Sequence, residues 1–145
     1  MDSSNAFGPG YLLTKIGQVI TLRFSAALEP LGIRPKHFGL MAAVASMPAS
    51  TQQDLGRALG LVPSAIVEMI DDLQTLGALR RAERPNDRRS HLIELTPSGQ
   101  ELLAKAAEAG REVDESVLAP LSPAKREALA SSVAIIGAEL GIAGS

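Results

Sequence analysis

Apolar residues recur at spacings of three and four along most of the chain, which is the pattern of helices with one buried face. The first such segment covers residues 11–29. A second runs from Pro35, a favourable first helical residue, to Pro48. Two more segments follow over residues 51–60 and 63–77, and each ends at a glycine. The pattern therefore predicts four helices in the first half of the chain.

The last two of these segments are joined by a tight, glycine-containing turn, which predicts a helix-turn-helix. Residues 78–83 and 90–96 then have the composition of two short strands. Residues 84–89, with their Pro-Asn-Asp sequence, are expected to form the turn between the strands. A helix-turn-helix followed by a hairpin is a winged helix.

Two further helices are predicted after the hairpin. Thr96 is a good cap and Pro97 a good first residue for a helix that ends before Pro120. The pair Ser122-Pro123 repeats the device and starts a last helix. The expected fold class is therefore mainly α with a small β-hairpin wing.

The domain organisation follows from these elements. We expect a flexible N-terminus over residues 1–10 and a single domain over residues 11–145, with the winged helix at about 33–96. The helices over residues 11–29 and 97–140 are apolar enough to need a partner surface. Packing against a second copy of the chain would supply it, so these helices are expected to form a dimerisation region.

Composition excludes several classes of protein. The chain has 145 residues, 46% of them hydrophobic, and none of its apolar runs approaches the roughly 20 residues of a membrane span. Its start lacks the pattern of a secretory signal. Without cysteine it has no disulfide, thiolate metal site or thiol redox sensor, which fits a cytoplasmic location.

Charge is distributed unevenly along the chain. The formal net charge is −2, yet residues 80–91 carry five arginines against two acids. From Pro97 to the end, four basic residues are set against seven acids. One arginine-rich segment on an acidic body predicts a focused site for an anion such as DNA.

Residues 87–99 carry the pattern D-x-R-x(5)-L-T-x-x-G, which resembles the wing and following helix start of the MarR family of bacterial winged-helix regulators. The resemblance covers roughly residues 11–140. Other segments in the expected order are Tyr11-Leu12-Leu13, Leu31 to Phe38, Asp54-Leu55 and Leu59-Gly60-Leu61. The resemblance implies an obligate homodimer whose recognition helices enter successive major grooves of a pseudo-palindromic operator, while the wings reach the adjacent minor grooves.

The wing residues expected to contact DNA are arginines and one acid. Arginine on a hairpin tip suits a narrow, negative minor groove. By the resemblance, Arg89 is the minor-groove residue and Asp87 fixes its orientation or that of the loop. Arg84 and Arg88 would then meet phosphates as positioning contacts.

The free face of the segment 63–77 supplies the remaining candidates, which are Pro63, Ser64, Ala65, Val67 and Glu68. Glu68 could accept a hydrogen bond from a cytosine amino group. Many relatives carry a basic residue at the positions of Glu68 and Asp72, so this chain departs from its family there. Because acids near phosphates are unfavourable, we expect Asp71 and Asp72 to lie away from DNA or to pair with arginines of the scaffold.

Regulators that resemble this chain often bind a small, commonly anionic aromatic effector between the dimerising helices and the winged domain. The candidates for such a pocket are Tyr11, His37, Phe38 and Met41. An apolar side chain at helical spacing is more often part of the core than of a pocket, and His37 can be a satisfied interdomain residue. The only histidines, His37 and His91, lack the spacing of a metal site. No metal or cofactor is therefore expected.

The function predicted from the sequence is that of a DNA-binding transcription regulator, acting as a ligand-responsive homodimeric repressor. The alternative is a winged-helix module that docks a basic protein through its acidic helix face and binds no specific DNA. An enzyme is disfavoured, because the sequence has no cysteine nucleophile, paired-carboxylate signature or phosphate-cradling glycine loop.

Overall fold

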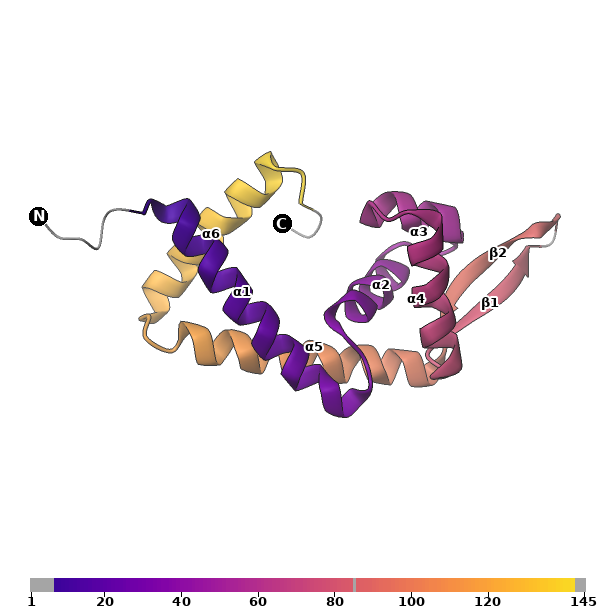
Figure 1. Cartoon of the computed structure of the whole chain (residues 1–145), viewed down its shortest axis with the longest axis horizontal. Helices are drawn as coiled ribbons and strands as arrows, with labels where there is room; N and C mark the ends of the chain where they lie inside the picture. Colours follow the sequence, from indigo (N-terminus) through magenta and orange to yellow (C-terminus); the bar gives the residue numbers. More distant parts are fainter. Residues whose placement is uncertain (1–6, 85, 143–145) are drawn as a thin grey trace, which may run out of the picture.

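The computed structural model describes residues 7–84 and 86–142, although the side chains of residues 87–89 lie outside the description. The described chain contains six α-helices, a 3-10 turn and a two-stranded antiparallel sheet (Figure 1). In chain order the elements are α1 (Pro9–Leu28), η2 (Glu29–Leu31), α2 (Pro35–Ser46), α3 (Gln52–Leu59), α4 (Pro63–Thr75), β1 (Leu79–Arg84), β2 (Asp87–Leu95), α5 (Pro97–Leu118) and α6 (Pro123–Glu139).

The elements divide into two ends joined by α5. Figure 1 shows α2, α3, α4 and the hairpin at one end, and α6 with the first half of α1 at the other. The long helix α5 runs along both parts, and α1 packs across it, with the Phe24 ring against Gly110. The winged end is therefore carried on a stem of two crossed helices.

The hydrophobic core lies in the winged end. Its largest fully buried side chains come from five different elements, and they are Leu28, Leu40, Met41, Leu55, Ile66, Ile70, Leu73 and Leu79. By contrast, the only buried residue of α6 is Gly137. The winged end therefore has its own hydrophobic core, whereas α6 buries no apolar side chain within the single chain.

The first turn of α5 packs tightly on Gly77 and Ala78, the residues that lead from α4 into β1. The backbone amide of Thr96 donates to the Ala78 carbonyl at 3.0 Å, and the Thr96 hydroxyl accepts from the Gly99 amide at 3.0 Å. The Ser98 hydroxyl donates to the Gly77 carbonyl at 2.8 Å. A Cβ atom on Gly99 would lie 1.9 Å from the Ala78 oxygen, so the position accepts only glycine.

The predicted fold class is confirmed, and two boundaries differ. The first helix begins at Pro9, inside the expected flexible segment, and residues 1–6 of that segment lie outside the described residues. The prediction of a turn over residues 84–89 was wrong, because Arg84 belongs to β1 and Asp87 begins β2. Cross-strand pairing continues to Arg84 opposite Asp87, past an irregularity after Glu83, so the turn is shorter than its composition indicates.

Ala49, in the turn between α2 and α3, has a φ of 60°, in the left-handed region that favours glycine. We expect Ala49→Gly to raise the free energy of unfolding by about 0.5 kcal/mol, because relief of the backbone strain slightly exceeds the added chain entropy of the unfolded state. Urea denaturation measures the change. Ala45→Gly, at an exposed position inside α2, should lower stability by about 1 kcal/mol, and a loss of stability in both variants would contradict the prediction.

Candidate nucleic-acid interface

The helix-turn-helix is formed by α3 and α4. Gly60, with a φ of 64°, ends α3 in the left-handed conformation, and the two helices approach closely where Gly56 faces Ile66. On its inner face α4 buries Ile66, Met69, Ile70 and Leu73. The opposite face of α4 is left free for a partner.

The recognition residues predicted in α4 differ in their availability. Pro63, Ser64 and Glu68 are exposed, and Glu68 lies one turn beyond Ser64 on the same side of the helix. Ala65 and Val67 are half-buried, so they present less surface than expected. The free face is therefore centred on Ser64 and Glu68.

Two of the three acids on α4 are held by other elements. Asp71 pairs with Arg81 of β1 at 2.7 Å, and Arg81 also donates to the side chain of Gln74. Asp72 accepts from Nε2 of His37 in α2 at 2.9 Å. The expected pairing with a scaffold arginine is confirmed for Asp71, whereas the partner of Asp72 is a histidine.

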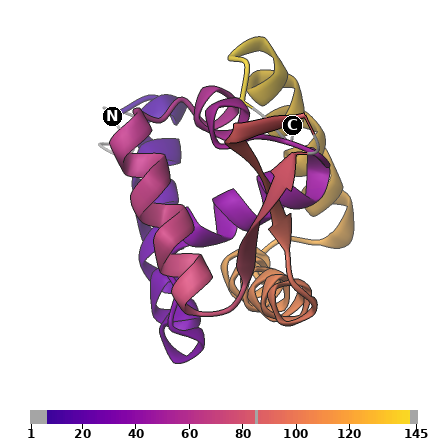
Figure 2. The ribbon, with the colours of Figure 1, turned by 90° about the vertical axis from the view of Figure 1, so that its right-hand side faces the viewer.

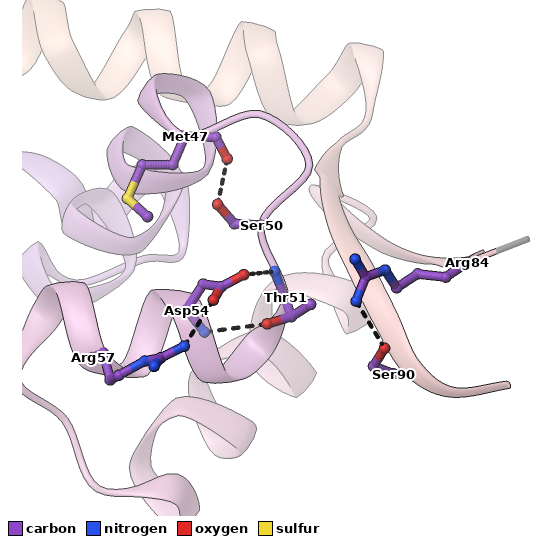
Figure 3. Close-up of polar contacts among 7 residues, drawn as sticks. All are labelled: Met47, Ser50, Thr51, Asp54, Arg57, Arg84 and Ser90. Atoms are coloured by element: carbon purple, nitrogen blue, oxygen red, sulfur yellow. Dashed lines mark hydrogen bonds and ion pairs between the residues drawn. The ribbon is translucent and has the colours of Figure 1, made fainter. Parts of the chain in front are cut away.

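The arginines of the hairpin differ in their contacts, although the sequence pattern does not distinguish them. Arg80 makes a cross-strand ion pair of 2.6 Å with Glu94, its register partner. Arg80 and Arg81, two of the five arginines in residues 80–91, are therefore both held in ion pairs at the base of the hairpin. Arg84 lies near the tip, is exposed, and donates to the Ser90 hydroxyl at 3.4 Å (Figure 3).

The predicted roles of Asp87, Arg88 and Arg89 stay predictions. Their backbone lies in β2, but their side chains are outside the described residues. Figure 2 looks onto the end of the molecule where α4 and the hairpin lie side by side. The hairpin that carries the predicted wing residues therefore adjoins α4 through β1, where Arg81 pairs with Asp71.

The start of α3 is fixed by a reciprocal cap (Figure 3). The Asp54 amide donates to the Thr51 hydroxyl at 3.2 Å, and the Asp54 carboxylate accepts from the Thr51 amide at 2.8 Å. These hydrogen bonds, the backbone one first, and the Arg57 guanidinium hold the pKa of Asp54 below its ordinary value. The Ile93 amide donates to the Ser50 carbonyl at 3.0 Å, which joins the entry of α3 to β2.

A polar groove of about 620 Å³ lies between the start of α3 and the hairpin. Gln52 and Gln53 line it from α3, and Arg81, Arg84 and His91 line it from the strands. The two glutamines were not among the residues predicted from the sequence. Their place directly after the Thr51 cap was the available signal, because residues of a first helical turn lie beside whatever the cap contacts.

The four predicted effector residues do not gather in one cleft of a single chain. Met41 is fully buried in the core, and both ring nitrogens of His37 are already hydrogen-bonded. Phe38 is half-buried and packs edge-on against Phe24 at 5.3 Å. Tyr11 stacks on Phe7, roughly 20 Å from Phe24 at the helical rise of 1.5 Å per residue.

The described residues contain neither a cluster of metal ligands nor a membrane-spanning helix. No group of three or more histidine, aspartate or glutamate side chains in this part of the chain is arranged to hold a metal ion. Within the same residues, no helix has the length and apolar character needed to span a membrane.

A free recognition helix beside a basic hairpin defines the class of winged helix-turn-helix proteins. Comparison with known proteins makes the assignment specific. Residues 31–90 match the family model described as MarR family. The chain is 33% identical over 119 residues to the HTH-type transcriptional repressor Rv2887 of Mycobacterium tuberculosis, a match that covers 81% of this chain and 86% of the relative. The chain therefore belongs to the MarR family of transcription regulators.

Solved structures agree with this assignment. The complex of the M. tuberculosis protein Rv2887 with DNA matches 90% of this chain and 98% of its own, with a TM-score of 0.77 and 27% identity. The complex of Rv2887 with salicylic acid matches 92% of this chain and 99% of its own, with a TM-score of 0.76 and 28% identity.

Proposed function

We propose that this chain is a transcriptional repressor that binds a pseudo-palindromic DNA operator as a homodimer and responds to a small effector. The observation that carries the proposal is the free face of α4 beside the basic hairpin, with Asp71 and Asp72 turned to protein partners. The relative Rv2887, a named repressor with a DNA-bound structure, supports it. The proposal assigns no catalytic activity to the chain.

The homodimer is supported by apolar faces at both ends of the chain. Side chains that are 37–71% exposed follow α1 and α6 at helical spacing. They include Leu12, Ile16, Val19 and Leu22 in α1, and Leu129, Val133 and Ile136 in α6, with Leu140 at its C-terminal cap. Contiguous apolar surface of this extent marks an interface, and a second copy would cover both faces at once.

The parts of the interface have separate roles in the proposal. Arg84, with Arg88 and Arg89, supplies phosphate and minor-groove contacts, and Asp87 orients the tip. Pro63, Ser64, Ala65, Val67 and Glu68 face the major groove. The dimer sets the distance between the two α4 helices, which must match the roughly 34 Å repeat of one DNA turn.

The effector is proposed to be a small anion of aromatic character, and the salicylic acid complex of Rv2887 supports this class. Phe38 is the candidate that lies half-buried where the winged end meets α1, against Phe24. Tyr11, His37 and Met41 would contribute only after rearrangement or from the second copy. The effector would release DNA by favouring a dimer with the wrong spacing between its α4 helices.

Selection from a pool of random duplexes at two salt concentrations tests the proposal. We expect enrichment of an inverted repeat with half-sites about 10 base pairs apart, and binding that weakens as salt rises. Retention of no sequence at either salt would overturn the proposal and favour the protein-docking module.

Arg84 and Arg80 form a matched pair for testing the wing. Arg84→Ala should lower the salt slope of DNA binding by about one, because its exposed guanidinium meets a phosphate. Arg80→Ala removes the same charge from the same hairpin, but this arginine is held by Glu94 and should leave the slope unchanged. Fluorescence anisotropy over a salt series gives both slopes, and equal slopes in the two variants would contradict the assignment.

Glu68 is expected to read a cytosine. Among the described residues it makes no ion pair or hydrogen bond, so its carboxylate is available to accept from a base amino group. Glu68→Ala should relax the preference at one position of each half-site by roughly tenfold and strengthen binding to random duplex. Glu101→Gln, on the exposed side of α5, controls for lost negative charge, and an unchanged base preference in Glu68→Ala would refute the role.

A further inference from the structure

We propose that His37 is a positioning residue for DNA recognition, because it ties α4 to the first turn of α2 through Asp72. The proposal rests on the proposed function and concerns how α4 is held in place to read DNA. His37 is 7% exposed and lies at the third position of α2.

Both ring nitrogens of His37 form a hydrogen bond, each to a different helix region. The backbone amide of Arg34 donates to Nδ1 at 3.0 Å, which caps the start of α2. Because Nδ1 accepts, the proton of the neutral ring lies on Nε2, which donates to the Asp72 carboxylate at 2.9 Å. The imidazole therefore joins the start of one helix to the exposed face of another.

The helix to which Asp72 is tied is itself well fixed. Leu40, Met41 and Val44 of α2 are buried in the core. Phe38, the residue after His37, packs edge-on against Phe24 of α1 at 5.3 Å. One turn of α2 thus contacts the stem on one side and α4 on the other, so the His37 contact ties α4 to the scaffold.

The neighbouring acid provides a second tether, to a different element. Asp71 and Asp72 are about 100° apart around a helix. Asp71 is held by Arg81 of β1, and Asp72 by His37 of α2. A helix tied to two different elements keeps a fixed rotation about its axis, and this rotation decides which side chains meet the base edges.

The position of α4 should affect specific and random binding differently. Base contacts need bidentate geometry, whereas attraction to phosphates depends mainly on charge. Loss of the tether should therefore lower affinity for the selected operator and spare affinity for random duplex. The ratio of these two affinities, the specificity ratio, is the quantity to measure.

His37→Glu is the decisive variant. A glutamate at the third position of a helix can still accept from the Arg34 amide, but it places a like charge against Asp72. We expect the specificity ratio to fall roughly tenfold, a loss comparable to one mismatched base pair. Gln100→Glu, on the exposed face of α5, adds the same charge elsewhere and should keep the wild-type ratio.

Two rescue variants separate positioning from folding. His37→Gln can accept from Arg34 and donate to Asp72, so it should keep the wild-type ratio. In the double variant His37→Glu with Asp72→Asn, the asparagine amide can donate to the new carboxylate, and the ratio should return. Failure of the double variant to recover, while it melts like the wild type, would overturn the positioning role.

The outcomes also distinguish this role from the proposed function. Equal binding of operator and random duplex by the wild type would overturn the proposed function and this role together. A wild-type chain that discriminates, with a His37→Glu variant that discriminates equally well, would overturn the positioning role alone.

Discussion

Gly99→Ala is expected to lower the free energy of unfolding by about 3 kcal/mol, the largest effect of a single methyl group in the described chain. The new Cβ would lie 1.9 Å from the Ala78 oxygen and 2.8 Å from its carbon. These are backbone atoms, so no side-chain rotation relieves the contact. Because the Ala78 carbonyl also accepts from the Thr96 amide, a shift would weaken the cap of α5.

Urea denaturation followed by circular dichroism measures this loss. Gly110→Ala is the matched control, because it makes the same change in the same helix, where the new Cβ would meet the Phe24 ring at 3.5 Å. That variant should gain up to about 1 kcal/mol from helix propensity. Equal stability of Gly99→Ala and the wild type would contradict the close packing of α5 on Ala78.

Val133→Asp is expected to convert the dimer to a monomer and to weaken operator binding roughly 100-fold or more. Val133 is 48% exposed in the single chain and lies in the middle of the apolar face of α6. A carboxylate there would be buried without a partner in the dimer. The monomer would bind one half-site only and lose the effective concentration that the second half-site provides.

Sedimentation and fluorescence anisotropy report the two parts of this result. Ser131→Asp places the same charge about 200° away around α6, outside the stripe formed by Leu129, Val133 and Ile136. It should remain dimeric and bind the operator normally. A dimeric Val133→Asp variant with wild-type affinity would show that α6 is not part of the interface.

Much of the fold was predictable because its signals are local. Caps and prolines mark the starts of α5 and α6 at Pro97 and Pro123, as predicted. The hairpin turn was harder to place, because strand pairing depends on cross-strand partners and continued to Arg84 and Asp87, past the point where composition indicates a turn. Local sequence therefore predicts which helices and strands form better than it predicts where each of them ends.

The candidate site was only partly predictable. The charge of residues 80–91 does not distinguish Arg80, which the strand register places opposite Glu94, from Arg84 near the tip. The contact between His37 and Asp72 joins two residues that are 35 positions apart in sequence, so no local spacing indicates it. Tertiary packing therefore decides which charged side chains are paired within the chain and which are left exposed.

The most direct test of DNA binding by a dimer is the affinity for an operator whose half-site spacing is changed by half a helical turn. A pair of α4 helices carried on one dimer should bind the selected inverted repeat tightly and lose that affinity when about five base pairs are inserted between half-sites. Binding should then fall to that of a single half-site. Equal affinity for both spacings would contradict a dimer that reads two successive major grooves.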